Sequence, residues 1–463
     1  MPTLRARALT ALAGSALLLT AVPASPAWAT SAIVTVKVGG KPTGIVITPD
    51  SSRAYVSNAG TSAVNVISVT SGSLITTIPV CTNPQPPAIS ADGTRVVVAC
   101  NGDNTLRVIS VASNTVTATI PVGNSPGKPL VVGNRAYVSN FGGNSVSVVD
   151  LASSAVVATI PVGTGPTVGI LGTGNQYQSY GTTLFVPNGT GGTISLINTG
   201  TNTVTSTSTV GGQISAAAVS PGLSTTTEVF VSSSTSSSLV RMSQTGGAPF
   251  QSVPVGSKPS VPAVNIDGSR VFVANGGSKS VSIVSLDASP AKVIKTVPVG
   301  STPGDPVMDK SGSSMYVPNY GGSTVSVIST STNAVKATYQ VGNGPMGIAL
   351  APSGSKMLAA NSKDGTVSVV SLSSSTLAKA PTSVSVSTST SKQATISWKA
   401  STSSSVTGYV VTALPGGATC STSGTKCTIK GLTGGKSYTF AVQTKNKYGA
   451  GAPATSKSVT IKK

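Results

Sequence analysis

The chain has 463 residues, of which 30 are lysine or arginine and 10 are aspartate or glutamate, so its formal net charge is +20; histidine is absent. A Ser-His-Asp triad is therefore excluded, and the commonest general base of enzymes is missing. Scarce carboxylates also disfavour glycoside hydrolysis, which requires two of them at a defined separation. The composition favours a binding protein over an enzyme, and no residue is predicted to be catalytic.

The first 29 residues have the pattern of a secretory signal peptide. Arg5 and Arg7 form a basic start, an apolar run covers residues 8–22, and Ala-Trp-Ala at 27–29 provides a cleavage site. The apolar run is shorter than the ~20 residues that a bilayer requires, which disfavours a membrane anchor. We therefore expect an extracellular protein without a transmembrane segment, and cell-wall association is a further expectation.

Four cysteines occur as two local couples. Cys81 and Cys100 form one couple, and Cys420 and Cys427 form the other. An exported chain meets an oxidising compartment, so both couples are predicted to be disulfides. Neither spacing matches a zinc site, and neither a metal nor another cofactor is expected.

A repeat dominates residues 30–375. Thr-Ile-Pro-Val ends at Val80, Val122 and Val162, and related endings continue along the chain at about the 40-residue period of propeller blades. Each unit holds four segments rich in Val, Ile and Thr, separated by Gly, Asn, Asp and Ser turns, which predicts a four-stranded antiparallel sheet. Such a sheet exposes both faces alone, and stacking in a ring buries them.

Counting the units gives the size of the ring. Residues 32–38 form a strand without three partners of its own, and the last unit, ending near Ser373, lacks a fourth strand. Pairing these two would hide both edges, which predicts an all-β, eight-bladed β-propeller closed by the N-terminal strand. Seven blades remain the alternative, because units four and five are degenerate. The first strands begin near Ile45, Ala88, Leu130, Val168, Ala216, Val261, Val307 and Ile348.

The second strands carry a recognisable motif. It reads Tyr-Val-Ser-Asn at 55–58 and 137–140 and Tyr-Val-Pro-Asn at 316–319, and Pro-Val-Gly recurs with it. Residues 30–375 thereby resemble the YVTN-repeat (surface-layer-type) β-propeller family. The resemblance implies fold, export and frequent cell-surface location, but no single activity.

A second domain is predicted at 381–463, after a short linker at 376–380. Its alternating strands have the spacing of a β-sandwich. Trp398, Leu432 and Tyr438 stand where a fibronectin type III domain has its core tryptophan, its leucine and its tyrosine corner, so this segment resembles that module. It contains ten lysines and no acidic residue.

Basic and aromatic residues supply the candidate binding positions. Arg53, Arg95, Arg135 and Arg270 recur just before second strands, as does Lys356, and would gather on one face. Together with the lysine-rich sandwich they predict attraction to an anionic cell-wall polymer or polysaccharide. No nucleic-acid recognition motif is present, and a monomer is expected. Exposed aromatics that would stack on sugars are Phe141, Tyr320, Tyr177 and Tyr180.

Two further sets have mainly structural interpretations. Eight of the ten acids stand in turns, loops or strand ends, which leaves Asp305 and Glu228 unassigned. The alternative function, a secreted polysaccharide-acting hydrolase with an accessory fibronectin module, would depend on these two acids.

Asparagines close the second strand in seven of eight units and are predicted to cap the following turn; they are Asn58, Asn101, Asn140, Asn188, Asn275, Asn319 and Asn361.

Overall fold

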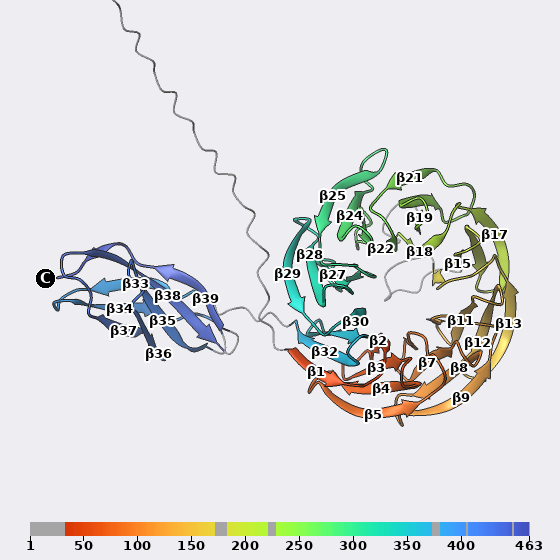
Figure 1. Cartoon of the computed structure of the whole chain (residues 1–463), viewed down its shortest axis with the longest axis horizontal. Helices are drawn as coiled ribbons and strands as arrows, with labels where there is room; N and C mark the ends of the chain where they lie inside the picture. The colour runs from red at the N-terminus through yellow and green to blue at the C-terminus, as the bar shows by residue number, and fades with distance from the viewer. Residues whose placement is uncertain are drawn as a thin grey trace, which may run out of the picture.

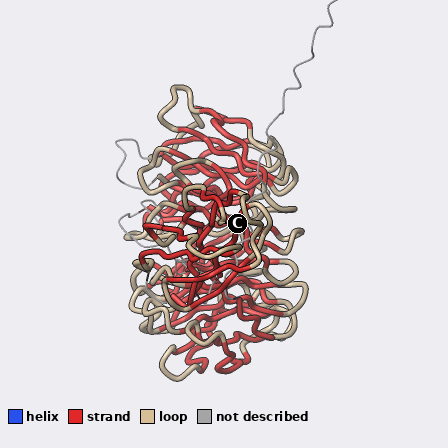
Figure 2. Tube along the Cα trace, turned by 90° about the vertical axis from the view of Figure 1, so that its left-hand side faces the viewer, coloured by secondary structure: helices blue, strands red, loops and turns tan. Residues whose placement is uncertain are grey.

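The computed structural model describes six stretches of the chain: 33–171, 183–220, 228–372, 380–403, 406–446 and 449–462. The predicted signal peptide at 1–29, Tyr177, Tyr180 and most of the predicted linker lie outside these residues. The described residues contain strands, turns and loops and no helix (Figure 2). Consequently, none of them forms a helix with the length and apolar character needed to cross a bilayer.

Within the described residues, the strands before residue 372 form eight antiparallel sheets of four strands each. The first contains β2 (Pro42–Ile47), β3 (Arg53–Asn58), β4 (Ala63–Ser68) and β5 (Ser73–Pro79), and the second contains β6 (Ala88–Ile89), β7 (Arg95–Cys100), β8 (Thr105–Ser110) and β9 (Thr115–Pro121). The third contains β10 (Leu130–Val132), β11 (Arg135–Asn140), β12 (Ser145–Asp150) and β13 (Ala155–Pro161), and the fourth contains β14 (Ile170–Leu171), β15 (Thr183–Asn188), β16 (Thr193–Asn198) and β17 (Thr203–Thr209).

The second half of the set repeats the same order. The fifth sheet contains β18 (Ile214–Val219), β19 (Glu228–Ser233), β20 (Ser238–Ser243) and β21 (Gln251–Pro254), and the sixth contains β22 (Pro259–Val264), β23 (Arg270–Asn275), β24 (Ser280–Ser285) and β25 (Lys292–Pro298). The seventh contains β26 (Val307–Met308), β27 (Ser314–Asn319), β28 (Thr324–Ser329) and β29 (Ala334–Gln340). The eighth contains β30 (Pro345–Leu350), β31 (Lys356–Asn361), β32 (Thr366–Ser371) and the N-terminal strand β1 (Ile33–Lys37).

The two ends of this region meet in the eighth sheet. Strand β1 pairs antiparallel with β32, from Ile33 opposite Val370 to Lys37 opposite Thr366. The predicted pairing of the N-terminal strand with the segment that ends near 373 is therefore confirmed. Figure 1 shows the sheets arranged in a ring, with β2, β18, β22 and β30 near its centre and β5, β9, β13 and β17 at its rim.

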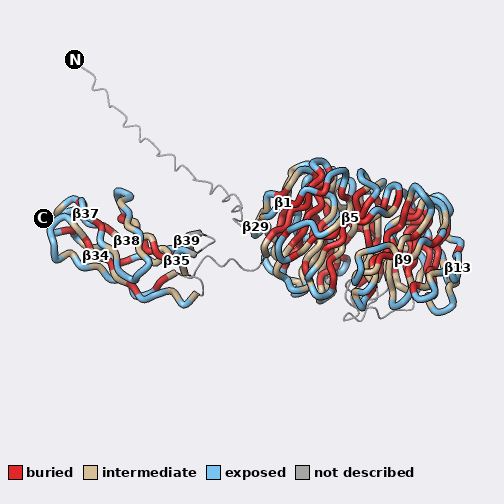
Figure 3. The backbone as a smooth tube through the Cα atoms, turned by 90° about the horizontal axis from the view of Figure 1, so that it is seen from below, coloured by how far each residue is buried: buried red, intermediate tan, exposed pale blue. Residues whose placement is uncertain are grey.

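Hydrophobic clusters lie between neighbouring sheets. One joins Tyr55 and Val64 of the first sheet to Val96 and Val98 of the second, and seven others join the remaining neighbours around the set. The cluster between the eighth and first sheets contains Leu358 as well as residues of β1 and β3. Burying a Val or Leu side chain is worth ~1.5–3 kcal/mol, so each sheet is stabilised by the neighbours that cover its two faces. Figure 3 shows the buried segments inside the ring and the exposed ones at its turns.

The residues from 380 onward form a β-sandwich. One sheet contains β33 (Thr382–Ser387), β34 (Gln393–Lys399) and β37 (Lys426–Lys430), and the other contains β36 (Thr419–Thr422), β35 (Val406–Leu414), β38 (Ser437–Asn446) and β39 (Gly449–Thr455), with β40 (Val459–Thr460) paired to β38. Trp398, Leu432 and Tyr438 are all in its core. The Thr433 amide donates to Tyr438 Oη at 3.3 Å, the backbone bond that a tyrosine corner makes.

Candidate functional site

The asparagines that end the second strands are structural. The Asn140 side chain is fully buried, and its Nδ2 donates to Ser145 Oγ at 3.0 Å and to Ser147 Oγ at 2.9 Å. Gly123 lies against the same amide, because a Cβ there would come within 2.4 Å of Asn140 Nδ2. The same glycine and hydroxyl contacts recur at Asn188, Asn275, Asn319 and Asn361.

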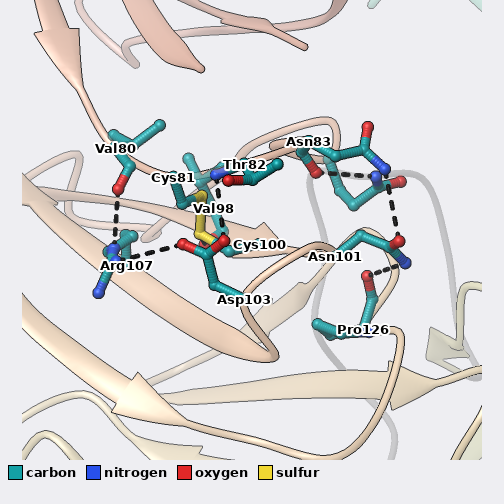
Figure 4. The surroundings of a disulfide bond; sticks show 11 residues. Val80, Cys81, Thr82, Asn83, Val98, Cys100, Asn101, Asp103, Arg107 and Pro126 are labelled. Carbon is teal, nitrogen blue, oxygen red and sulfur yellow. Dashed lines mark hydrogen bonds and ion pairs between the residues drawn. A yellow bond between two sulfur atoms is a disulfide. The ribbon is translucent and has the colours of Figure 1, made fainter.

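The second sheet departs from this arrangement. Cys100, and not the predicted Asn101, ends its second strand, and Cys81 occupies the place of the glycine. The two cysteines form a disulfide with a Cα–Cα distance of 5.8 Å (Figure 4). The Thr105 hydroxyl, which an asparagine at position 100 would contact, is buried without a hydrogen-bond partner among the described residues. The disulfide thus replaces the asparagine contact of the other sheets. Counting Asn101 among the turn asparagines was wrong by one residue.

The four predicted arginines connect neighbouring sheets. Each begins a second strand, is half-buried, and donates from Nη1 to the following sheet. The acceptors, in chain order of the arginines Arg53, Arg95, Arg135 and Arg270, are Val111 O at 2.7 Å, Asn134 Oδ1 at 3.2 Å, Thr199 O at 3.1 Å and Thr330 O at 2.6 Å. Lys356 instead donates to Ser371 Oγ of its own sheet at 2.9 Å. These hydrogen bonds occupy guanidinium donors that would otherwise be free to bind a polyanion.

The aromatic candidates lie in loops. Phe141 is 47% exposed, and its ring would lie within 3.1 Å of a Cβ placed at Gly165 of the next sheet. Tyr320 is half-buried, and the ammonium of Lys363 lies 4.4 Å from its ring centre. A cation already covers one face of Tyr320, whereas Phe141 remains open to solvent.

Most turn acids bind their own turns. Asp92 accepts hydrogen bonds from the Ser90 hydroxyl and from the Thr94 amide and hydroxyl. The Ser90 hydrogen bond, followed by that of the Thr94 amide, holds the pKa of Asp92 below its usual range. Asp50 repeats this arrangement in the first sheet. Such carboxylates are ionised turn caps and not general acids.

Glu228 is held by an ion pair. Arg241 donates from Nε and Nη2 to both carboxylate oxygens at 2.9 and 2.8 Å, and the two side chains are 12% and 11% exposed. Arg241 also donates to Gln251, whose Nε2 donates to Ala291 O of the sixth sheet at 2.7 Å. The Arg241–Glu228 pair itself lies within the fifth sheet, and Gln251 makes the connection to the next sheet. Glu228 does not line the cavity that contains Asp305, so the structure does not bring these two acids together.

A cavity of about 620 Å³ lies among the first strands of the third to seventh sheets. Its walls are mainly apolar and include Val168, Ala216, Val261 and Met308. The opposite side of the ring is closely packed: a Cβ at Gly44 would come within 2.4 Å of Pro86 Cβ, and one at Gly347 within 2.8 Å of Thr43 O. The free space is therefore displaced from the axis of the ring.

Among the described residues, four charged ones line this cavity, namely Lys128, Asp305, Asp309 and Lys310, and the first two of them stand at one level. Lys128 stands two residues after Pro126, which bridges to Asn140, and Asp305 stands two residues after Pro303, which bridges to Asn319. Their nitrogen and oxygen atoms are more than 4.0 Å apart, so they form no ion pair.

The surrounding protein acts on both charges. Desolvation by the surrounding ring lowers the pKa of Lys128, and the charge of Asp305 partly opposes this, although the Lys128 side chain is itself exposed within the cavity. Desolvation by the surrounding ring likewise raises the pKa of Asp305, which is also exposed within the cavity. This shift is opposed by a hydrogen bond that Asp305 Oδ1 accepts from Val261 N at 3.4 Å and by the charge of Lys128. Sequence analysis missed Lys128; the signal was a charge inside the Pro-x-x-Pro segment before a first strand.

Lysines gather on the outer face of the smaller sandwich sheet. Lys426 lies opposite Ser397 and Lys430 opposite Gln393, on the side away from the buried Ala394 and Ile396. Lys399 continues this outer face, and all three lysines are exposed. The described part of residues 380–462 contains no acidic residue to neutralise them. This lysine face (Lys399, Lys426 and Lys430) is therefore a positively charged surface.

Comparison with known proteins identifies the sandwich. Residues 379–461 match the family model of the fibronectin type III domain, so this part of the chain is a fibronectin type III domain. No curated protein matches the chain. Among solved structures, the hydrazine synthase of Kuenenia stuttgartiensis is similar at 17% identity and a TM-score of 0.49, covering 76% of this chain and 99% of that one. A likeness this low carries no argument about the chain's fold or function.

Proposed function

We propose that the chain is an extracellular binding or scaffold protein that is held on an anionic wall polymer by its fibronectin type III domain. In this proposal residues 30–375 are an eight-bladed β-propeller of the YVTN-repeat type. Support comes from the eight four-stranded sheets, the pairing of β1 with β32, and the hydrophobic clusters between successive sheets. The two disulfides fit export into an oxidising compartment.

The lysine face is the observation that carries the proposal. The arginines of the ring already donate to neighbouring sheets, whereas Lys399, Lys426 and Lys430 are exposed on one face of a domain whose described residues include no aspartate or glutamate. An anionic surface attracts each such lysine by ~1 kcal/mol at physiological salt. Three lysines acting together would contribute ~3 kcal/mol, which corresponds to roughly a hundredfold in affinity.

Retention on purified cell walls tests the proposal. We would compare the intact protein with the triple variant K399Q/K426Q/K430Q and with K37Q/K292Q/K295Q. The second triple variant removes the same net charge from exposed lysines in the ring region. Walls stripped of phosphate polymer by hydrofluoric acid would provide the ligand control. A salt series would cover Debye lengths from ~10 Å to ~3 Å.

We expect the sandwich variant to lose roughly a hundredfold in retention, and the control variant to lose much less. Binding should also fall with salt and on the stripped walls. Equal losses in the two triple variants would mean that net charge alone drives attachment, and the lysine face would have no special role. Undiminished binding to stripped walls would rule out the anionic polymer as the ligand.

A further inference from the structure

The central cavity has the features of a ligand site that the wall-binding proposal leaves unused. Its volume of about 620 Å³ is within the ~300–1,000 Å³ range of small-molecule pockets. The close packing at Gly44 and Gly347 shows that the ring does not leave an even channel along its axis. The space is a pocket on one side, bounded by the first strands of five sheets.

Lys128 and Asp305 occupy equivalent positions in their respective repeats. In each unit one residue pairs with the residue that ends the second strand; two residues after it, the eight units have Gly44, Pro86, Lys128, Val168, Ala216, Val261, Asp305 and Gly347. Only the third and seventh units are charged there. Three sheets lie between these two units on either side in a ring of eight, so Lys128 and Asp305 stand on opposite sides of the ring, and their charges have opposite signs.

Lys128 and Asp305 present exposed charged groups to a cavity whose walls are mainly apolar. Among the described residues, Lys128 forms no ion pair, and Asp305 accepts a single hydrogen bond, the long one from Val261. Both groups are therefore accessible to a ligand in the cavity, and opposite charges placed beside them would be attracted to them. A molecule that presents a carboxylate to one side and an ammonium to the other would pair both groups at once, and Val168, Ala216 and Met308 would cover its apolar part.

We propose that the central cavity binds a small zwitterion, an amino acid or short peptide with both termini free, whose carboxylate contacts Lys128 and whose ammonium contacts Asp305. The termini of an extended dipeptide are ~7 Å apart, so such a ligand can reach across a gap that the two side chains do not close themselves. This site is independent of the lysine face and of wall binding.

Isothermal titration of the intact protein with four matched peptides tests the charge requirement. The probes are Leu-Leu, N-acetyl-Leu-Leu, Leu-Leu-amide and N-acetyl-Leu-Leu-amide, which carry both charges, the carboxylate only, the ammonium only, and neither. We expect Leu-Leu to bind at least roughly tenfold more tightly than each singly charged probe, a factor that corresponds to about 1.4 kcal/mol. The neutral probe should bind most weakly.

Variants assign the two charges. K128M should remove the advantage of a free carboxylate, and D305N should remove the advantage of a free ammonium. Their controls, K295M and D287N, change exposed residues of the sixth sheet and should bind Leu-Leu as the wild type does. K128D/D305K should regain binding, because the peptide can enter in the reverse direction.

Three results would overturn the proposal. The first is that none of the four peptides binds the wild type. The second is that the singly charged or neutral probes bind as tightly as Leu-Leu, which would indicate an anion site, a cation site or an apolar pocket. The third is that K128M and D305N lose no more affinity than their controls. Circular dichroism of each variant separates loss of binding from loss of fold.

Discussion

The replacement of the glycine–asparagine contact by a disulfide makes a quantitative prediction about the second sheet. The Cys81–Cys100 bond spans 19 residues, and closing such a loop in the unfolded chain is worth about 3 kcal/mol on the chain-entropy model. Removing both cysteines should therefore cost about 3 kcal/mol in the opening free energy of this sheet. How much is recovered should depend on which residues replace them.

The substitutions C81G and C100N should be favourable only together. In the third sheet, a Cβ at the glycine would come within 2.4 Å of the asparagine Nδ2, and overlaps of this kind cost ~1–3 kcal/mol. The amide introduced by C100N would also donate to the Thr105 hydroxyl, which now has no partner among the described residues; a hydrogen bond contributes about 1 kcal/mol. We expect a favourable coupling of ~1–3 kcal/mol between the two substitutions.

A double-mutant cycle measures this coupling. The four proteins are C81A/C100A, C81G/C100A, C81A/C100N and C81G/C100N, all without the disulfide, so the loop entropy cancels. Hydrogen-exchange mass spectrometry of peptides covering β7 and β8 reports the local opening free energy without assuming that the whole chain unfolds together. A coupling within about 0.5 kcal/mol of zero would show that Cys100 does not occupy the asparagine position, and the register argument would fail.

Three further predictions concern the charged residues. R270M should destabilise the sixth and seventh sheets by ~1.5–3 kcal/mol through loss of its bond to Thr330 O, measured by urea unfolding against K292M; an equal effect of the two would contradict it. R241M should cost about 3 kcal/mol because it leaves the Glu228 carboxylate unpaired, and E228Q/R241M should recover much of this loss. D305N should be more stable than the wild type at neutral pH. The pKa of Asp305 is raised in the folded chain, so its ionisation lowers the free energy of unfolding as the pH rises above about 4, and asparagine does not ionise. The difference should vanish below about pH 4, and a constant difference across pH would refute the cause.

Much of the fold could be predicted from the sequence because the repeat is local. Each unit contains its own strands and turns, so the first strands near Ala88, Leu130 and Val307 could be located from hydrophobic segments and turn residues alone. The pairing of residues 32–38 with the last unit also followed, because each end lacked what the other supplied. The cysteine couples were recognisable for the same reason of proximity.

The contacts between repeats could not be read in this way. Arg135 and Thr199 are 64 residues apart, and no periodic pattern in the sequence states that one arginine reaches the next sheet. The Arg241–Glu228 fork reverses the usual arrangement in one sheet, so it does not repeat and gives no periodic signal. Lys128 was missed because its importance depends on Asp305, a residue four units away across the ring.

These observations separate two kinds of residue in a repeat protein. Residues that recur, such as the buried asparagines and the arginines at strand starts, are the ones whose hydrogen bonds hold the sheets together. A site that needs one particular ligand must break the repeat, because identical positions around a ring present identical chemistry eight times. Lys128 and Asp305 break it at equivalent positions on opposite sides with opposite charges. A chance departure would have no reason to pair in this way, so the irregular positions, and not the conspicuous recurring arginines, are where the binding specificity of the ring should be sought.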